Sequence, residues 1–466
     1  MRKIDRNARI MILGAGPGGL SAAHYLRRYG YKNVTVFEKL GRVGGLCRSV
    51  TEDYQSFDLG AAVVSPDYRE VLKIARHTGA RLEKVIGAAA FSLGNGNSGN
   101  PYHRLLGYLA GGSSWTKYFR FLRICLQYIW KRSLIREVFQ RPGWAGIASH
   151  PELCVNFSIW LKNNRLEELS RLFEIPITTF GYGNLDEIPA PYALRYMSPK
   201  TLLAGLLSGI KLSRFLPSWL LIRRFKNGFQ RFWEKVAWGL NVRLNVEVKA
   251  IDRSDEGITV TYSHPVQIIG DQVAHSEDKT RFDYLIIACP LLKENLEKMM
   301  DLTEEEAWLQ SRTKFIPYVV TSFEIADMVL KERIAFHLPL PPFGEPMIIS
   351  QPHPDNELMA FYARLPSANP TEDDERRLYE HVQRYVKAFG GRIKTDDDWH
   401  SYDAWLYFKH VSVEEFRAGY YDSWEKIQGD NRTFYVGGLF DFDYVEGIVR
   451  YSRSLIEKNF HHKCSK

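Results

Sequence analysis

The chain has 466 residues, of which 45% are hydrophobic and 25% charged, and its net charge is +8. This length exceeds that of one ordinary domain, and the composition excludes a disordered or fibrous chain, so we expect two folded domains. The five scattered cysteines form no Cys-x-x-Cys pair and no His/Cys cluster at metal spacing. This pattern predicts reduced thiols, no metal site and an intracellular, cytoplasmic protein.

The first predicted element is a buried strand over residues 9–13, and it runs directly into a glycine loop. Three spaced glycines in this loop allow a sharp exit from the strand, close approach of a pyrophosphate and tight packing of the next helix. A second strand over residues 34–37 ends at Glu38, where an acceptor for ribose hydroxyls belongs. The sequence therefore predicts a dinucleotide site that includes Gly14, Gly16, Pro17, Gly18, Gly19 and Glu38.

The next stretch distinguishes between the common adenine dinucleotides. A second glycine pair lies within Lys39–Ser49, and an Asp-x-Gly sequence lies within Phe57–Val64. This arrangement resembles the extended N-terminal motif of the flavin amine oxidase and carotenoid desaturase superfamily. The resemblance implies non-covalent FAD, with Arg42 and Arg48 placed to balance its phosphate charge. Further cofactor contacts are expected from Lys39, Arg42, Gly44, Gly45, Leu46, Gly60, Ala61 and Ala62.

The middle of the chain changes character several times. We expect an exposed glycine-rich turn at residues 92–100 and a basic, helical region from about 101 to 220. Alternating apolar residues around Asp255-Glu256-Gly257 predict a hairpin within residues 240–263, and Val248 in this hairpin is assigned to the cofactor site. Another buried strand is predicted at residues 281–290.

Positive charge is concentrated in two stretches of the chain. Residues 117–141 contain seven Lys/Arg and one Glu, and residues 211–231 contain six Lys/Arg and no acidic residue. Aromatic and aliphatic residues alternate with these charges at helical spacing, which is typical of helices on a membrane surface and also of solvated basic helix faces. We expect peripheral contact with an anionic membrane and no nucleic-acid partner, since no nucleic-acid-binding motif is present.

No membrane span and no secretory leader are expected. The most apolar region, residues 201–222, is interrupted by Lys211 and Arg214, whereas a spanning helix needs about 20 apolar residues. The first strand begins near residue 9, which leaves no room for an apolar leader before it.

The last part of the chain completes the predicted fold. A mixed section of strands and helices covers about 295–420, and residues 432–460 read as strand, glycine turn and helix, which resembles the C-terminal flavin motif of the same superfamily. Gly437, Gly438 and Val445 are assigned to the cofactor on this basis. The fold class is α/β. A Rossmann-type FAD-binding domain (1–80, 225–290 and 425–466) is interleaved with an amine oxidase-like α+β substrate domain (81–224 and 291–424).

Two further stretches suggest a more specific resemblance. Thr178–Met197 and Asp403–Gly438 resemble segments of the bacterial FAD-dependent polyenoic fatty acid isomerases. The resemblance implies an unsaturated acyl substrate and no net oxidation. Flavin N5 takes a hydride from the methylene between two double bonds, and the same hydride returns elsewhere on the chain. Phe180, Tyr182, Tyr407 and Tyr444 are predicted to line the substrate pocket, and no catalytic acid, base or nucleophile is assigned.

The sequence departs from those isomerases at the substrate carboxylate. The arginine and the aromatic residue that clamp it align, without gaps, with Ala89 and Gly205 here, and neither can hold an anion. Arg81, Lys84 and Arg104 are candidate replacements, and an ester or thioester substrate is the alternative.

Two other functions are consistent with the same motifs. The first is net oxidation of an amine or a lipid by FAD. The lysine that many amine oxidases place beside flavin N5 is absent from Phe315–Ile325, although Lys314 precedes that stretch. The second is a membrane-surface binding protein that keeps a nucleotide for stability.

Overall fold

A parallel sheet of five short strands contains the strand that leads into the glycine loop. The structure is a computed structural model that describes residues 4–52, 55–93, 102–103, 105–269, 272–353, 355–367, 369–394 and 400–461. The strand order is β20-β13-β1-β2-β9, and all neighbours are parallel. Every residue of the central strand is buried, as expected for a strand covered on both faces. The strands are β1 (Ile10–Leu13), β2 (Val34–Phe37), β9 (Asn241–Arg243), β13 (Tyr284–Ile287) and β20 (Thr433–Tyr435).

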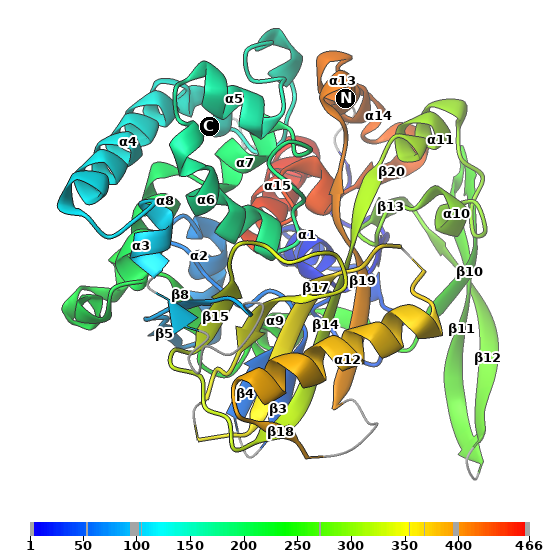
Figure 1. Cartoon of the computed structure of the whole chain (residues 1–466). Helices are drawn as coiled ribbons and strands as arrows, with labels where there is room; N and C mark the ends of the chain where they lie inside the picture. Colours follow the sequence, from blue (N-terminus) through cyan, green and yellow to red (C-terminus); the bar gives the residue numbers. More distant parts are fainter. Residues whose placement is uncertain are drawn as a thin grey trace.

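Helices from both ends of the chain pack together beside this sheet. α1 (Pro17–Arg28) follows the glycine loop and packs against α15 (Val445–Asn459), drawn in blue and red in Figure 1. α2 (Arg69–Thr78) packs on α15, and α9 (Phe229–Ala237) packs on α1 and α2. The predicted order of strand, glycine turn and helix is therefore confirmed at both ends of the chain.

Three antiparallel strands form a separate sheet that extends along one side of the molecule (Figure 1). They are β10 (Glu247–Ser254), β11 (Gly257–Ile269) and β12 (Gln272–Phe282). The predicted hairpin is confirmed, since Ser254 pairs with Gly257 across the turn. Two predicted boundaries are wrong. Residues 241–243 belong to the parallel sheet, and the strand predicted at 281–290 is divided at Asp283, whose N–H donates to the Arg9 carbonyl at 2.7 Å and redirects the chain.

A larger mixed sheet forms the second layer of strands. Its order is β18-β14-β17-β16-β15-β6-β7. In addition, β19 pairs with β14 over residues 314–322, whereas β18 pairs with residues 325–326 of the same strand. One face packs against α12 (Glu372–Ala388), which crosses the sheet in Figure 1, through Leu378, Val382 and Tyr385. The strands are β6 (Ala89–Phe91), β7 (Tyr102–His103), β14 (Lys314–Ala326), β15 (Ile334–His337), β16 (Pro346–Ser350), β17 (Leu358–Arg364), β18 (Arg392–Ile393) and β19 (Ser401–His410).

Helices dominate the chain between residues 105 and 208, as the sequence predicts. They are α3 (Leu105–Leu109), α4 (Trp115–Leu134), α5 (Phe157–Asn163), α6 (Ser170–Glu174), α7 (Ala190–Tyr196) and α8 (Pro199–Ser208), with a π-helical turn, η4 (Ile175–Thr179). The predicted glycine-rich turn at 92–100 lies outside the described residues, apart from Ser92 and Leu93.

Smaller elements connect these parts. They are the hairpin β3 (Ser49–Glu52) and β4 (Gln55–Asp58), the pair β5 (Leu82–Lys84) and β8 (Arg223–Phe225), and the helices α10 (Lys293–Leu296), α11 (Glu304–Ser311), α13 (Val413–Arg417) and α14 (Tyr420–Ile427).

The two basic stretches differ in structure. The first contains most of the 20-residue helix α4, but the second is not a helix. It forms the short 3₁₀ turns η5 (Lys211–Phe215) and η6 (Ser218–Leu220), then strand β8 and the start of α9. Pro217 lies between the two turns and cannot donate an N–H to a helix, which explains the interruption. The helical interpretation of residues 211–231 is therefore wrong.

The domain division stays a proposal. The parallel sheet draws its strands from the three segments assigned to FAD binding, and the larger mixed sheet draws its strands from the two segments assigned to the substrate. This strand membership is compatible with the proposed boundaries.

A buried ion pair joins the helical region to the C-terminal segment. The Nε atom of Arg195 on α7 lies 2.9 Å from a carboxylate oxygen of Asp441, and the two side chains are 2% and 0% exposed. The guanidinium of Arg195 also donates to the carbonyl oxygens of Phe139, Arg141 and Gly143 at 2.7 to 3.0 Å. One side chain therefore fixes two loops.

Replacement of Arg195 tests this junction. Arg195→Met leaves the Asp441 carboxylate buried without its counter-ion, so we expect a loss of about 3–5 kcal/mol in the free energy of unfolding. The double variant R195M/D441N should lose less than the sum of the two single variants, because neither charge then remains buried. Urea unfolding followed by circular dichroism measures both effects. Arg376→Met, at an exposed ion pair on α12, is the control and should leave stability nearly unchanged. Additive losses in the double variant would contradict the coupling.

Candidate functional site

The loop between β1 and α1 has the backbone geometry of a phosphate site. Gly14 has a φ of +104°, and a Cβ there would lie 3.1 Å from the backbone nitrogen of Cys289. At Gly19 a Cβ would lie 2.0 Å from the carbonyl oxygen of Gly14, so the helix can pack this closely only with glycine. Gly16 caps α1 without a side-chain hydrogen bond, which leaves the N–H groups of the first turn directed at the loop.

Glu38 holds this loop from the end of the next strand. Its side chain is 8% exposed. One carboxylate oxygen accepts the Ala15 N–H at 2.8 Å, and the other accepts the Leu40 N–H at 2.9 Å. Each oxygen keeps a second lone-pair direction, so the carboxylate can also accept ribose hydroxyls.

A second glycine pair presses against the first loop. Gly44 and Gly45 both have positive φ values, of 102° and 53°, and a Cβ on Gly45 would lie 3.2 Å from the Gly16 Cα. Gly60 packs equally tightly, because a Cβ there would lie 1.7 Å from the Leu46 carbonyl oxygen. These contacts hold the first loop, the second glycine pair and the Asp-x-Gly stretch in one compact unit.

One cavity of about 900 Å³ runs from this unit to the large mixed sheet. Its volume is in the range of cofactor and substrate pockets. Sixteen of the predicted cofactor residues line it: Gly14, Gly16, Pro17, Gly18, Glu38, Lys39, Arg42, Gly45, Leu46, Gly60, Ala61, Ala62, Val248, Gly437, Gly438 and Val445. Gly19 and Gly44 lie behind the wall, where they permit close packing.

The cavity suits a dinucleotide at its glycine-loop end. Lys39, Arg42, Lys249 and Lys298 line it together with the N-terminus of α1, so positive charge is available for phosphates. A Cβ on Gly437, whose φ is +139°, would meet no atom within 4 Å, which leaves open space at that wall. The residues present therefore fit FAD.

Arg48 has a partner within the protein. Its guanidinium pairs with the carboxylate of Asp403, and Arg48 is not one of the residues that line the cavity. Its expected role in balancing phosphate charge stays a prediction.

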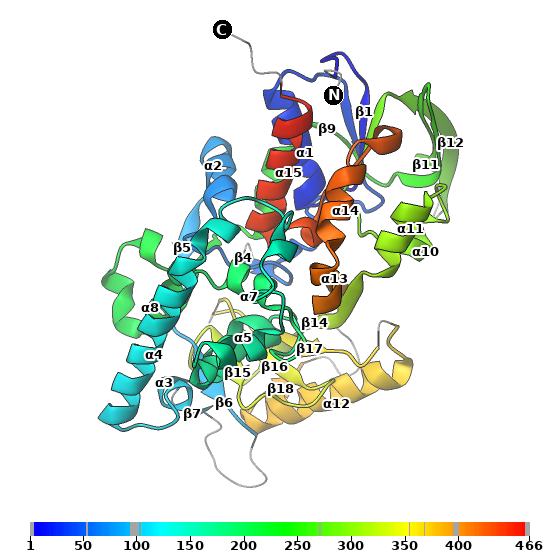
Figure 2. The same cartoon turned by 90° about the horizontal axis from the view of Figure 1, so that it is seen from above.

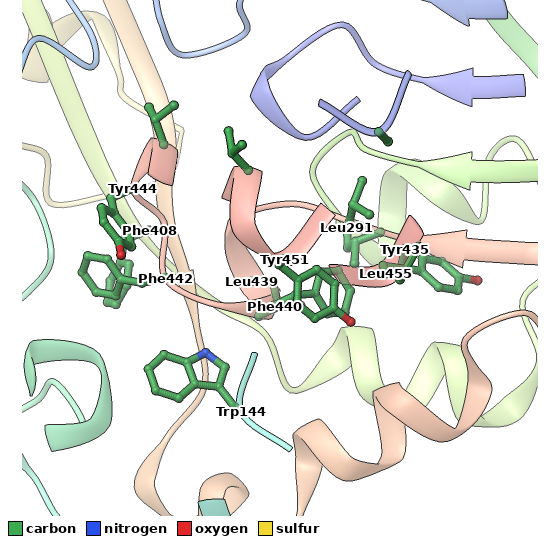
Figure 3. Packing of buried hydrophobic residues seen from close by; sticks show 14 of the residues in the cluster. Trp144, Leu291, Phe408, Tyr435, Leu439, Phe440, Phe442, Tyr444, Tyr451 and Leu455 are labelled. Atoms are coloured by element: carbon green, nitrogen blue, oxygen red, sulfur yellow. The ribbon is translucent and has the colours of Figure 1, made fainter. Parts of the chain in front are cut away.

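The C-terminal segment contributes an aromatic part of the wall. Figure 3 shows Tyr444, which lines the cavity, close to Phe442 and Phe408. The ring centroids of Phe442 lie 5.3 Å from Phe408 and 5.6 Å from Tyr444. This packing positions Tyr444, where α15 begins.

The predicted substrate residues Phe180, Tyr182, Tyr407 and Tyr444 all line the cavity. The large mixed sheet adds residues that sequence reasoning missed: Tyr318, Val320, Ile348, Tyr362 and Trp405. Tyr318 is paired in register with Trp405, and Val320 with Tyr362, so neighbouring strands bring these side chains together. Tyr318 and Val320 are two residues apart on β14 and therefore face the same side of the sheet, and this alternation was the signal in the sequence that could have identified them.

Burial makes these tyrosines weaker acids. Removal from water raises the pKa of Tyr182, Tyr318 and Tyr407 well above the ordinary value of a phenol. The hydroxyl of Tyr362 donates to the Asp58 carbonyl oxygen at 3.2 Å. These rings form an aromatic, uncharged part of the cavity wall.

Several ionisable groups in the wall were not predicted as site residues, and Asp58 and Lys409 are two of them. Burial raises the pKa of Asp58 to about 6, although its carboxylate accepts from Ser49 Oγ and the Phe229 N–H. Lys409 on β19 is nearly buried, and its Nζ lies 3.4 Å from Asp443 Oδ2. Lys314, by contrast, is exposed and does not appear among the lining residues.

Arg81 and Lys84, two of the suggested substitutes for the missing carboxylate clamp, do not line the cavity. Ala89 is in the core and Gly205 is exposed on α8. Arg81 lines a separate small pocket, Lys84 donates to two backbone carbonyls, and Arg104 lies outside the described residues.

A different pair of cations faces the cavity. Arg224 and Arg333 both line it and share one carboxylate, because Glu83 Oε1 lies 2.5 Å from Arg224 Nε and 3.5 Å from an Arg333 nitrogen. Arg224 holds the pKa of Glu83 below its usual range. Two guanidinium groups against one carboxylate leave a net positive charge, and Arg333 is 41% exposed. An anionic group can therefore bind there.

Within the described residues, no group of three or more His, Cys, Asp or Glu side chains is arranged to hold a metal ion. Cys47, Cys125, Cys154 and Cys289 are free thiols. In the same part of the chain, no helix is both long and apolar enough to cross a membrane.

Comparisons with known proteins agree with the geometry of the site. Residues 17–307 match the model of the flavin containing amine oxidoreductases. A polyenoic fatty acid isomerase of Ptilota filicina is 41% identical over 64 residues, a stretch that covers 14% of this chain and only 13% of that protein. The structure of a CLA-producing fatty acid isomerase from P. acnes superimposes with a TM-score of 0.79 at 22% identity and covers 98% of this chain and 100% of its own.

An amine oxidase has the same fold. Cyclohexylamine oxidase from Brevibacterium oxydans superimposes with a TM-score of 0.63 at 16% identity, over 97% of this chain and 99% of its own. The family model spans more than half of the sequence, from the end of the glycine loop at Pro17 through Glu38 and the predicted hairpin. The chain is therefore an enzyme of the flavin containing amine oxidoreductase family, and its cofactor is FAD.

Proposed function

We propose that this enzyme is an FAD-dependent isomerase that moves double bonds along polyunsaturated acyl chains. The observation that carries the proposal is the aromatic, uncharged part of the cavity wall formed by Tyr318, Tyr362 and Trp405. Such a wall suits an acyl chain better than a charged amine. The full-length similarity to the P. acnes isomerase supports the same substrate class.

We assign FAD to the charged end of the cavity. The N-terminus of α1 and Arg42 would hold the pyrophosphate, and Glu38 would accept the ribose hydroxyls. Gly437 and Gly438 would allow the flavin to lie close to the backbone at the start of α15. When bound, the flavin supplies acceptance and return of a hydride, so that double bonds move without net oxidation.

The protein side chains contribute orientation and a dry environment. Removal of a hydride from a methylene between two double bonds leaves positive charge spread over five carbons of the substrate. The faces of buried aromatic rings such as Tyr182 and Tyr407, whose centroids lie 5.4 Å apart, can stabilise that charge. No acid or base is required, and none is assigned.

Loss of the Glu38 carboxylate should weaken FAD binding. We expect Glu38→Ala to reduce the affinity of the apoprotein for FAD by about 1–3 kcal/mol, because the loop loses two acceptors and the ribose loses its partner. Titration of apoprotein with FAD, followed by flavin fluorescence, measures this. Glu247→Ala is the matched control: Glu247 also lines the cavity, but its carboxylate is 64% exposed and pairs with Lys249. An unchanged affinity in Glu38→Ala, or an equal loss in both variants, would contradict the assignment.

Incubation with linoleic acid and longer polyenes tests the reaction itself. Movement of a methylene-interrupted double bond into conjugation creates an ultraviolet chromophore, and we expect its formation without oxygen uptake or peroxide. Apoprotein stripped of FAD is the control and should give no product. A reducible flavin with no product from any polyene would show that the substrate class is wrong.

The second candidate is net oxidation of an amine or a lipid. Lys409 favours it, since it supplies a buried lysine in the cavity wall that Phe315–Ile325 lacks. Stoichiometric peroxide, or turnover of amines alone, would establish oxidation in place of isomerisation. A flavin that neither a lipid nor an amine reduces would favour the third possibility, a binding protein.

We assign the carboxylate of the substrate to Arg333, supported by Arg224. Arg333→Gln should raise KM for a free polyenoic acid about tenfold, equivalent to about 1.4 kcal/mol, while kcat and the KM for the methyl ester stay nearly unchanged. Steady-state kinetics with both substrates provides the comparison. Arg312→Gln, at an exposed ion pair outside the cavity, is the control. If KM rises equally for acid and ester, Arg333 does not bind the carboxylate.

A further inference from the structure

An apolar stripe on α4 faces solvent. Its members are Trp115, Phe119, Leu122, Leu126, Trp130 and Leu134, and each is between 54% and 78% exposed. They are spaced three or four residues apart, which places them on one side of the helix. The buried residues Phe121, Ile124 and Tyr128 face the protein instead. The helix is therefore apolar on two sides, and only one of them is needed for folding.

A neighbouring segment exposes similar residues. α8 packs against α4, and η5 and η6 pack against α8. Both segments lie on the same side of the molecule in Figures 1 and 2. Leu203, Ile210, Leu212, Phe215 and Trp219 in this segment are 46% to 73% exposed. Together with the stripe on α4 they form what we call the apolar face, defined by these eleven residues.

Basic side chains surround the apolar face. The exposed ones include Lys117, Arg120, Arg123, Arg136, Lys200, Lys211 and Arg214. Arg120 pairs with Glu168, and Lys211 pairs with Glu332 at 2.9 Å, while Arg214 stacks over the ring of Phe215. The remaining cations exceed the acidic groups of these segments, so the surroundings of the apolar face are net positive.

We propose that the apolar face docks on the surface of an anionic lipid bilayer. Three of its eleven members are tryptophans, Trp115, Trp130 and Trp219, a residue type that favours the boundary between water and acyl chains. Lysine and arginine beside them are complementary to anionic headgroups. A 20-residue helix is about 30 Å long, so α4 would lie in the plane of the membrane with its stripe inserted. The proposal does not depend on the identity of the reaction.

The apolar face is also fastened to the cavity wall. Lys84 Nζ donates to the carbonyl oxygens of Arg214 and Leu216 at 2.8 Å, and Val85, the next residue, lines the cavity. The Val85 N–H donates to the Ile222 carbonyl at 2.9 Å. A membrane docked on residues 210–219 would therefore lie next to one edge of the cavity.

Sedimentation of the holoenzyme with vesicles tests the proposal. We expect binding to vesicles of phosphatidylglycerol and phosphatidylcholine at low salt, weaker binding at high salt, and little binding to pure phosphatidylcholine. Phe119→Ser combined with Trp130→Ser should reduce binding at least about tenfold, because two exposed anchors are lost. Trp308→Ser combined with Val329→Ser removes two exposed apolar residues elsewhere and is the matched control, with binding unchanged. FAD absorbance and circular dichroism confirm that each variant is folded.

A charge-reversed variant, Arg123→Glu with Arg214→Glu, separates attraction from insertion. It should lose the preference for anionic vesicles while the protein remains folded. Equal binding of wild type to neutral and anionic vesicles, or equal losses in the F119S/W130S variant and its control, would overturn the proposal. A dimer in lipid-free buffer that F119S/W130S dissociates, together with no vesicle binding, would show that a second copy covers this face instead.

Discussion

The contact between Arg195 and Asp441 is the constraint on which the site depends. Two full charges lie in the interior, where each is stable only beside the other, so the residues around them have few alternative arrangements. The guanidinium also satisfies three carbonyl oxygens of the loop at 139–143. Because Asp441 lies between Gly437 and Val445, the same contact sets the position of the backbone that lines the cavity from the C-terminal side. The Arg195 side chain therefore connects the helical region, the loop and the C-terminal wall of the cavity.

The cavity separates two chemical environments along its length. Backbone N–H groups and lysine or arginine side chains gather at the carboxyl end of the parallel sheet, where open α/β folds bind their ligands. At the other end the antiparallel strands β14, β17 and β19 contribute aromatic rings, and burial raises the pKa of the Tyr318 and Tyr407 hydroxyls further above the ordinary value of a phenol. This division would allow a highly charged cofactor and the proposed acyl substrate to share one continuous space.

Much of the cofactor end could be predicted from sequence, because its requirements are local. Gly14 has a positive φ, and a Cβ on Gly19 would lie only 2.0 Å from the Gly14 carbonyl oxygen. Both positions therefore require glycine for reasons that lie within the loop itself. The substrate end depends on contacts between distant segments, which no local pattern reveals. Lys409 meets Asp443, Arg224 meets Glu83 and Arg48 meets Asp403 only after the sheets assemble. The helix predicted for residues 211–231 is wrong for a local reason. The apolar residues there have helical spacing, but Pro217 interrupts the segment.

The hydrogen bonds that Glu38 accepts from the protein itself have a consequence for the entropy of cofactor binding. Its carboxylate holds the N–H groups of Ala15 and Leu40 by contacts within the protein alone, so the glycine loop needs no ligand to adopt its shape. A loop that is already ordered loses little conformational entropy when a ligand arrives, and more of the contact energy is retained as affinity. These two hydrogen bonds therefore help to preorganise the loop for the phosphates and ribose of FAD.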